Sequence, residues 1–368
     1  MSGIDPLLSD TATRVFADTS TFAAVEQAET DGWAPAIWDA VAETGLAWVS
    51  VPESAGGSGG SLADAVEVLR IAGRHAVPLP LAETGVLGGW LLAGAGLDIP
   101  DHAVSVVPGL PRDDVRLDRG ALTGTAHRVP WARAVGTIVL LAEDAGRAVV
   151  VAADANDVRV HAAVNLAGEP RETVGFDGVV PLAVAPVARG LDGNALRQRG
   201  ALARTAVMAG ALERLEELTL EYTATRRQFG KPVGTFQAVQ AHLVHGAQES
   251  VLVSVALAAA VRATEAGPAR FEVAAAKLLA DQAATTATRH AHQAHGAMGM
   301  TREYPLHHLT RRLWAWRSEY GDERAWSRTL GDWIVAAGPD ALYPVIAGGS
   351  RALESAMTVA PSGARDDT

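Results

Sequence analysis

The segment from Arg226 to Gln240, RRQFGKPVGTFQAVQ, joins two long helical patterns and decides how the rest of the chain is read. A corner between two helices needs a glycine and sometimes a proline, but it does not need adjacent arginines beside Phe229. A guanidinium group binds phosphate through paired hydrogen bonds, and an aromatic side chain packs on a planar ring. The segment therefore predicts a binding site for an anionic, planar ligand.

The helical patterns around this corner are long and their connections are short. Apolar residues recur at helical spacing over 195–225 and 236–266, and a third pattern runs from Pro268 towards His295. Two shorter helices are expected after Pro305 and Gly321. Such a series predicts an antiparallel four-helix bundle over residues 191–350. The polar residues 351–368 are expected to form a disordered tail.

The first half of the chain changes character once. Residues 1–102 read as a helical domain, in which Ser61 is the expected N-cap of a helix over 62–73. Residues 103–190 predict a small antiparallel β domain, a barrel or a sandwich, because the β-type runs 137–142 and 148–153 flank an Asp-Ala-Gly turn. The predicted fold class is mainly α with a small β domain between two helical domains.

Composition restricts the class of protein. The chain has 368 residues, a formal net charge of -11 and no cysteine. The negative charge disfavours nucleic acid as a partner, and the lack of cysteine excludes disulfides and thiolate chemistry. No basic, apolar leader is seen at the start, and no uninterrupted apolar run approaches the roughly 20 residues of a spanning helix. We therefore expect a cytoplasmic protein without membrane contact.

A second informative segment, HQAHGAMGMTREYP, spans residues 292–305. A long helix ends there in a turn of small residues, which lets a ligand approach the backbone closely. Its candidate contacts are Gln293, Gly296, Ala297 and Gly299. Taken alone, the segment is equally a helix C-terminus followed by a proline stop.

Together the two segments resemble the acyl-CoA dehydrogenases, flavoenzymes that remove hydrogens from Cα and Cβ of an acyl-CoA thioester. The family pattern Arg-x-x-Phe-Gly, followed by a Gln, is matched by Arg226, Phe229, Gly230 and Gln237. The family pattern Gln-x-x-Gly-Gly-x-Gly before Tyr-Pro is matched from Gln293 to Pro305, with Ala297 in place of the second glycine. The Gly-rich segment 51–61 also looks like part of the family's first domain. The resemblance covers residues 30–340.

This resemblance implies a cofactor, a substrate class and an assembly. The cofactor would be FAD, the substrate an acyl-CoA of fatty acid or lipid metabolism, and the electron acceptor an electron-transfer flavoprotein. The resemblance also implies a tetramer built as a dimer of dimers. Arg226, Phe229 and Gln237, with Gln293 and the turn that follows it, would contact the pyrophosphate and adenosine part of FAD across a subunit interface.

The catalytic base is the point at which the chain departs from the family. The reaction needs a carboxylate above Cα, which most members place directly before a glycine that follows the Tyr-Pro pair. Here that position is Tyr320, and Glu319 is one residue early. Other members place the base near the start of the first bundle helix, where this chain has Gly200. Glu319 is the candidate base if the turn shifts; otherwise the chain has none.

The middle domain departs from the family as well. The family's Thr-Glu-Pro-x-x-Gly-Ser-Asp and Trp-Ile-Thr segments, which enclose the flavin ring, are absent, and Trp131 aligns only loosely with the second of them. Three interpretations follow: an FAD-dependent acyl-CoA dehydrogenase, a non-catalytic partner subunit of a heterotetrameric one, or a scaffold that has lost FAD. No metal site is expected, because the histidines of the C-terminal half lack carboxylates at ligand spacing.

Overall fold

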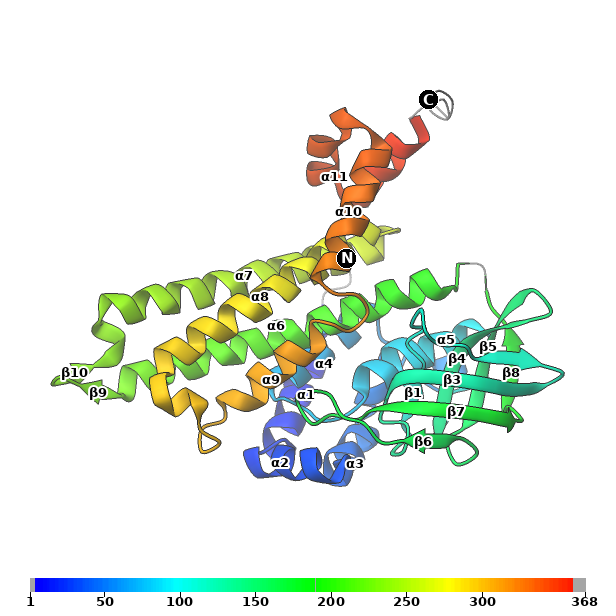
Figure 1. The fold of residues 1–368 in the computed structure, drawn as a ribbon, viewed down its shortest axis with the longest axis horizontal. Helices are drawn as coiled ribbons and strands as arrows, with labels where there is room; N and C mark the ends of the chain where they lie inside the picture. Colours follow the sequence, from blue (N-terminus) through cyan, green and yellow to red (C-terminus); the bar gives the residue numbers. More distant parts are fainter. Residues whose placement is uncertain (1–3, 189, 360–368) are drawn as a thin grey trace.

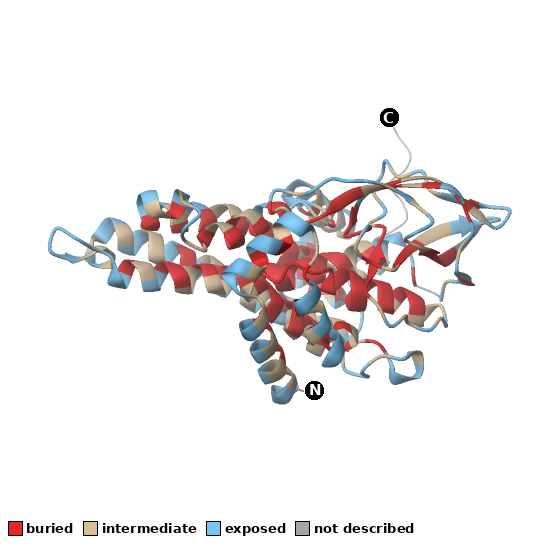
Figure 2. Cartoon of the chain, turned by 90° about the horizontal axis from the view of Figure 1, so that it is seen from below, coloured by how far each residue is buried: buried red, intermediate tan, exposed pale blue. Residues whose placement is uncertain are grey.

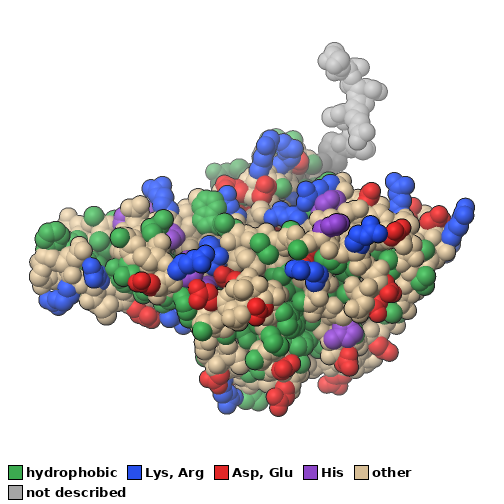
Figure 3. All heavy atoms as spheres, turned by 60° about the horizontal axis from the view of Figure 1, so that its bottom comes forward, with side chains coloured by type: hydrophobic (Ala, Val, Ile, Leu, Met, Phe, Trp, Pro, Cys, Tyr) green, Lys and Arg blue, Asp and Glu red, His purple; other side chains and the backbone are tan. Residues whose placement is uncertain are grey.

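The computed structural model describes residues 4–188 and 190–359, and the chain forms three parts around a shared core. Helices come first, a β domain follows, and a long helical bundle completes the fold (Figure 1). The prediction of a mainly α protein with a small β domain is confirmed. Figure 3 shows acidic and basic side chains scattered over one face of the molecule, with apolar side chains between them.

The N-terminal part is helical, as expected. Ser61 accepts a hydrogen bond from the Asp64 backbone N–H, and the Asp64 carboxylate accepts one from the Ser61 N–H, so α4 begins with a capping box. The predicted N-cap is therefore confirmed. The elements of this part are α1 (Pro6–Thr19), α2 (Phe22–Asp31), α3 (Pro35–Glu43), α4 (Leu62–Arg74), the π-helix η3 (Ala82–Gly89) and α5 (Trp90–Gly94), with single 3₁₀ turns η1 (Leu46–Trp48) and η2 (Glu53–Ala55).

The middle part contains two four-stranded sheets, with strand orders β1-β4-β5-β8 and β2-β3-β7-β6. The predicted hairpin is confirmed, since β4 and β5 pair antiparallel on either side of a turn in which Ala145 and Gly146 have positive φ. The expectation of a purely antiparallel domain was wrong, because β1 pairs parallel with β4. The strands are β1 (Val104–Val106), β2 (Arg116–Asp118), β3 (Ala121–Pro130), β4 (Thr137–Asp144), β5 (Arg147–Asp154), β6 (Arg159–His161), β7 (Arg171–Val179) and β8 (Ala183–Pro186).

The C-terminal part is a bundle of long helices whose connections are short. The two predicted long patterns form α6 and α7, which meet at the hairpin β9–β10, and the third forms α8. The elements are α6 (Gly193–Thr225), β9 (Arg227–Gln228), β10 (Lys231–Pro232), η4 (Val233–Thr235), α7 (Gln237–Ala266), α8 (Arg270–His295), η5 (Gly296–Met300), α9 (Leu306–Trp316), α10 (Glu323–Ala337), η6 (Pro339–Ala341) and α11 (Leu342–Val359).

The end of the chain differs from the expectation of a disordered tail after residue 350. Residues 351–359 continue α11, and Leu353 is fully buried against the residues around Ala341 and Val345. In Figure 1, α10 and α11 project away from the bundle. The rest of the expected tail, 360–368, lies outside the described residues.

α6 is the central helix of the molecule. Its residues from Gly200 to Leu212 are all buried, and burial in Figure 2 is concentrated along the middle of the helices. α4 packs directly on α6, because a side chain at Gly73 would overlap the Val207 backbone and one at Gly210 would overlap the Arg70 backbone. These two glycines bring the helix axes close together and leave no gap between them.

α7 bears on the expectation that no segment of the chain spans a membrane. Its 30 residues reach a mean hydropathy of 1.4 in an 18-residue window, which is long and apolar enough for a membrane span by composition alone. One such helix is weak evidence for insertion, because the helices of a bundle pass the same test. α7 packs on α6 and α8, while Val244, Val251, Leu252 and Val255 leave its outer face apolar and exposed.

Candidate functional site

The arginine corner lies at the far end of the bundle, where the chain turns from α6 into α7. Phe229 has φ 51° and Gly230 has φ 80°, so two successive residues in the left-handed region close the turn of the hairpin. Phe229 is 91% exposed, and Arg226 and Gln237 are exposed too. This hairpin is the outermost tip of the bundle in Figures 1 and 2. The sequence therefore directs these side chains away from the chain that carries them.

The second predicted segment lies at the same end of the bundle. Gln293 is exposed in the last turn of α8, and Gly296, with φ 61°, ends that helix. The bend is held against the end of α6, because the Tyr304 hydroxyl donates to the Leu218 carbonyl and the His295 ring stacks on Tyr222 at 4.5 Å between centroids. The fold thus brings the two motifs, which are more than fifty residues apart in sequence, to one end of the molecule.

The polar side chains of this end are available to a ligand. Among the described residues, the side chains of Arg226, Gln237 and Gln293 make no hydrogen bond, so none joins Arg226 to Gln293. Gly299 is buried beside His295, where a side chain would crowd the His295 Cβ, so this stretch is built for close backbone packing. A guanidinium group, two amides and an exposed aromatic ring suit the diphosphate and adenine of a dinucleotide such as FAD.

The predicted base has a different environment, deep between the three parts of the chain. Glu319 accepts hydrogen bonds from Arg171 Nε at 2.7 Å and from Arg204 Nε at 2.6 Å. Its side chain is 9% exposed, and those of the two arginines are 4% and 5% exposed. Both carboxylate oxygens of Glu319 are therefore occupied by cations of this chain.

These contacts set the pKa of Glu319. Burial alone would raise it, but the charges and hydrogen bonds of Arg171 and Arg204 outweigh burial and lower the pKa to about 2. A general base works best with a pKa near the operating pH. A carboxylate held at so low a pKa, with both oxygens paired, is poorly suited to remove a proton.

The two positions at which the family carries its base meet in this structure. A side chain at Gly200, on α6, would overlap the ring of Tyr320, so the ring lies directly on the backbone of Gly200. Tyr320 is 8% exposed and has φ 55°, an uncommon conformation for a bulky residue. One position therefore lacks a side chain and the other places a phenol in the same space. Neither supplies a carboxylate.

Glu319 belongs to a chain of ion pairs that joins all three parts of the molecule. Arg204 also pairs with Glu83 of η3, and Arg171 pairs with Glu169 at 3.0 Å. Arg312 of α9 extends the chain, because it pairs with Glu169 at 3.5 Å and with Glu29 of α2 at 2.8 Å. Most of these side chains are at least nine-tenths buried, so the charges have few partners other than one another.

Sequence analysis missed most of this network. Glu83, Glu169, Arg171, Arg204 and Arg312 stand in otherwise apolar or regular stretches and match no motif. The only available signal was a lone charge within a predicted buried face, such as Arg204 in the alanine-rich middle of α6. Trp131 does lie near this region, with its ring 4.7 Å from the Arg171 guanidinium carbon.

The two cavities that Arg171 lines are small. The cavity between α4, α6 and Trp131 has a volume of 20 Å³, and the one beside Glu319, Tyr320 and Arg128 has 60 Å³. Pockets for cofactors and drug-sized ligands have volumes of about 300–1,000 Å³. Neither of these two cavities is large enough for a ligand of that size.

A buried lysine holds the turn that carries Glu319 and Tyr320. Lys277 Nζ donates to the carbonyl of Arg317 at 3.1 Å and to that of Gly321 at 2.9 Å, and it pairs with Asp281. These bonds fix the turn from both sides. No group of three or more His, Asp or Glu side chains is placed to hold a metal ion within residues 4–188 and 190–359.

Comparison with known families gives two matches that together cover most of the chain. Residues 7–98 match the model of the acyl-CoA dehydrogenase N-terminal domain, and residues 196–323 match that of the C-terminal domain. The acyl-CoA dehydrogenase IpdE2 of Mycobacterium tuberculosis is 30% identical over 290 residues, which are 75% of this chain and 79% of that protein.

Solved structures share the fold. The ChsE4-ChsE5 complex from Mycobacterium tuberculosis superposes with a TM-score of 0.84 at 23% identity, over 92% of this chain and 99% of that one. A variant of the Tcur3481-Tcur3483 steroid acyl-CoA dehydrogenase superposes with a TM-score of 0.79 at 25% identity, over 89% of this chain and 96% of that one.

Proposed function

Because this chain belongs to the acyl-CoA dehydrogenase family, we propose that it is the non-catalytic subunit of a heteromeric acyl-CoA dehydrogenase. The observation that carries this proposal is the contact between Tyr320 and Gly200, which fills the space of the base with a side chain that is not a carboxylate. Glu319, the nearest carboxylate, is bound by two arginines. The chain keeps the fold of the enzyme and lacks the group that starts the reaction.

In this proposal the exposed end of the bundle contacts the cofactor. Arg226 binds the diphosphate of an FAD held mainly by the catalytic partner, Phe229 and Gln237 lie against its adenosine part, and Gln293 with the following turn completes the contact. FAD supplies hydride acceptance in the partner's site. The residues of this chain neutralise the diphosphate, orient the cofactor and exclude water from one side of it.

The buried ion-pair network supports the proposal that the partner subunit, and not this chain, carries the base. Protonation of Glu319 would forfeit its charge pairing with Arg171 and Arg204, and breaking a buried ion pair costs about 3–5 kcal/mol. Such a cost would slow a reaction step by two to four orders of magnitude. The network is consistent with a structural role, in which it joins the three parts of the chain without substrate or flavin.

The comparisons favour a heteromeric assembly. The two solved structures described above are named for two different chains, ChsE4 with ChsE5 and Tcur3481 with Tcur3483. By analogy, a tetramer of this chain with a base-carrying acyl-CoA dehydrogenase would receive an acyl-CoA in the partner's site and pass electrons to an electron-transfer flavoprotein.

Co-expression tests the proposal. The full chain is purified alone and together with the product of an adjacent acyl-CoA dehydrogenase gene, and the flavin absorbance of each preparation is recorded. We expect a colourless chain alone and a yellow complex that bleaches when acyl-CoA is added. A yellow homotetramer of this chain that bleaches with acyl-CoA would reject the partner role.

A second candidate function is dehydrogenation by this chain itself, with Glu319 as the base. Glu319 is adjacent to the family position and lines the 60 Å³ cavity, which favours this alternative. It requires Glu319→Gln to abolish bleaching in a preparation of this chain alone. Absence of flavin under every co-expression condition would instead support the third interpretation, a scaffold without FAD.

A further inference from the structure

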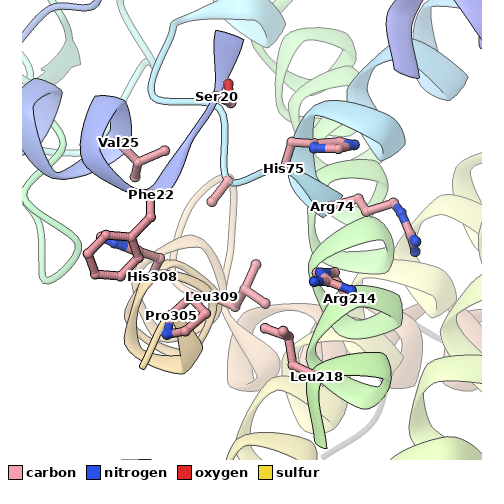
Figure 4. Close-up of a pocket in the computed structure, with 11 residues that line it drawn as sticks. Ser20, Phe22, Val25, Arg74, His75, Arg214, Leu218, Pro305, His308 and Leu309 are labelled. Carbon is pink, nitrogen blue, oxygen red and sulfur yellow. The ribbon is translucent and has the colours of Figure 1, made fainter. Parts of the chain in front are cut away.

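A cavity on the side of the molecule has a volume of 370 Å³ and shares no lining residue with the two small interior cavities. It lies where four helices approach one another: α2, the end of α4, α6 and the start of α9 (Figure 4). Its volume falls within the range of about 300–1,000 Å³ that is typical of small-molecule sites. No step of the proposed function uses it.

One wall of the cavity is apolar. Val25, Leu218 and Leu309 line it and are each at most 5% exposed, so their side chains are fixed by the core behind them. Phe22 lies beside Val25 on α2 (Figure 4), is 38% exposed, and contacts the His308 ring edge-on at 4.8 Å between centroids. A ligand with a short hydrocarbon portion would remove this surface from water.

The α6 side of the cavity, which carries Leu218, also carries a guanidinium group with donors to spare. Arg214 lies on α6 beside the cavity in Figure 4, and its Nη1 donates to Glu217 at 3.1 Å and to Glu221 at 3.2 Å. Its Nε and Nη2 make no hydrogen bond to any described residue. These two nitrogens form one side of the guanidinium fork, and that geometry matches the two oxygens of a carboxylate.

Two arginines and two glutamates balance their charges on this side of the cavity. Arg74 gives both terminal nitrogens to Glu217, so two arginines share the nearby carboxylates. The pKa of His75, which lines the same wall, is lowered by burial and then by the charges of Arg74 and Arg214, while Glu217 opposes them with a smaller effect.

We propose that this cavity is a binding site for a small amphipathic carboxylate, whose carboxylate pairs with Nε and Nη2 of Arg214 and whose hydrocarbon chain lies between Phe22 and Leu309. The site does not depend on the catalytic role of the chain, because it lies outside the Glu319 region and the exposed end of the bundle.

Calorimetric titration of the full chain, alone or in its co-expressed complex, with octanoate and with 1-octanol tests the proposal. The two probes have the same chain length and differ in the head group. We expect octanoate to bind about tenfold or more tightly than 1-octanol, because charge-assisted hydrogen bonds are the stronger class. We also expect affinity to rise from butanoate to octanoate, because the longer chain buries more apolar surface.

Variants locate the site. Arg214→Gln is expected to remove the preference for octanoate over 1-octanol, and Arg214→Lys to retain part of it, because lysine keeps the charge and loses the fork. Arg262→Gln, at an exposed position on α7, is the matched control and should leave both affinities unchanged. Melting curves of all variants verify the fold. Equal affinity for both probes, absence of octanoate binding, or full retention of the preference in Arg214→Gln would each overturn the proposal.

Discussion

The two regions that carry the family's chemistry have opposite characters in this chain. Around Glu319 the side chains are buried, paired with one another and packed so closely that cavities of only 20 and 60 Å³ remain. Around Arg226 they are exposed and lack partners among the described residues. One region pairs its charged side chains with one another; the other presents its polar groups outwards.

This difference shows that the exposed end and the interior of the chain are under different physical constraints. A chain that still contributes to a cofactor site in a complex must keep outward-facing donors, whereas its own interior can be filled. Buried charges without partners are costly, so charges enclosed in an interior need complementary groups. In this chain Arg171 and Arg204 complement Glu319, and Tyr320 occupies the space over Gly200.

The largest effect is expected at the exposed end. Arg226→Ala should lower the flavin content of the co-expressed complex by an order of magnitude or more, because the diphosphate loses a charge-assisted pair of hydrogen bonds. Flavin absorbance per complex measures this. Arg262→Ala, at an exposed position on α7, the helix that follows the corner, is the control and should keep the flavin. If Arg226→Ala retained the full flavin content, the corner would have no role in the cofactor site.

The next effect concerns the interior. Arg204→Leu leaves Glu83 and Glu319 buried without their shared partner and should destabilise the chain by about 3–5 kcal/mol. Denaturant titration followed by tryptophan fluorescence measures the change. Arg328→Leu, on the exposed side of α10, is the control and should change stability by less than about 1 kcal/mol. Similar values for both variants would show that the network adds nothing to the fold.

Acid should lower the unfolding free energy of the chain by protonating Glu319. The pKa of Glu319 is about 2 in the folded chain, below its ordinary value of 4.5, so its contribution is complete above the ordinary value and is lost as pH falls towards 2. Its full size is on the order of 3 kcal/mol. Unfolding free energy measured at a series of pH values should fall less steeply over this window in Glu319→Gln. Identical slopes in both proteins would show that Glu319 is not paired.

A smaller effect is expected where Tyr320 meets α6. Gly200→Ala adds a methyl group that overlaps the Tyr320 ring and should destabilise the chain by about 1–3 kcal/mol. The effect should shrink in a Tyr320→Ala background, since the space is then empty. A double-mutant cycle from thermal melting measures the coupling. Additive effects would place the ring elsewhere.

The smallest effect lies between the two regions, on α6. Burial raises the pKa of Glu216 to about 7, so folding disfavours its charge, and stability is lost as pH rises from its ordinary value through 7. Glu216→Gln should therefore raise the melting temperature by a few degrees at pH 8 and have little effect at pH 5. Glu221→Gln, on the exposed side of the helix, is the control. An equal rise in melting temperature at both pH values would contradict a raised pKa of Glu216.

Sequence patterns predicted the frame of the molecule well where periodicity was long. The helical patterns on either side of the Arg226 corner became α6 and α7 with ends within a few residues of those expected, and the Asp-Ala-Gly hairpin formed as predicted. The final helix was missed because its second half, from Arg351, is short, polar and small in composition. Its stability comes from tertiary contacts such as those of Leu353, which a local pattern does not contain.

The candidate site was predictable only in part, for a physical reason. A binding turn such as Gln293 to Gly299 is local, so its residue spacing is visible in sequence. The environment of Glu319 is made by Arg171 and Arg204, which are more than one hundred residues away. Sequence counting placed Tyr320 and Gly200 at the two base positions, but only the fold shows that they occupy one space.

The most direct test of the account is the ratio of flavin to protein in the purified complex of this chain with its catalytic partner. The closed interior predicts one FAD for each pair of unlike chains, and none on this chain alone. A value of one FAD for every chain would contradict the account, because this chain would then hold a cofactor in the space that Tyr320 and the ion pairs occupy.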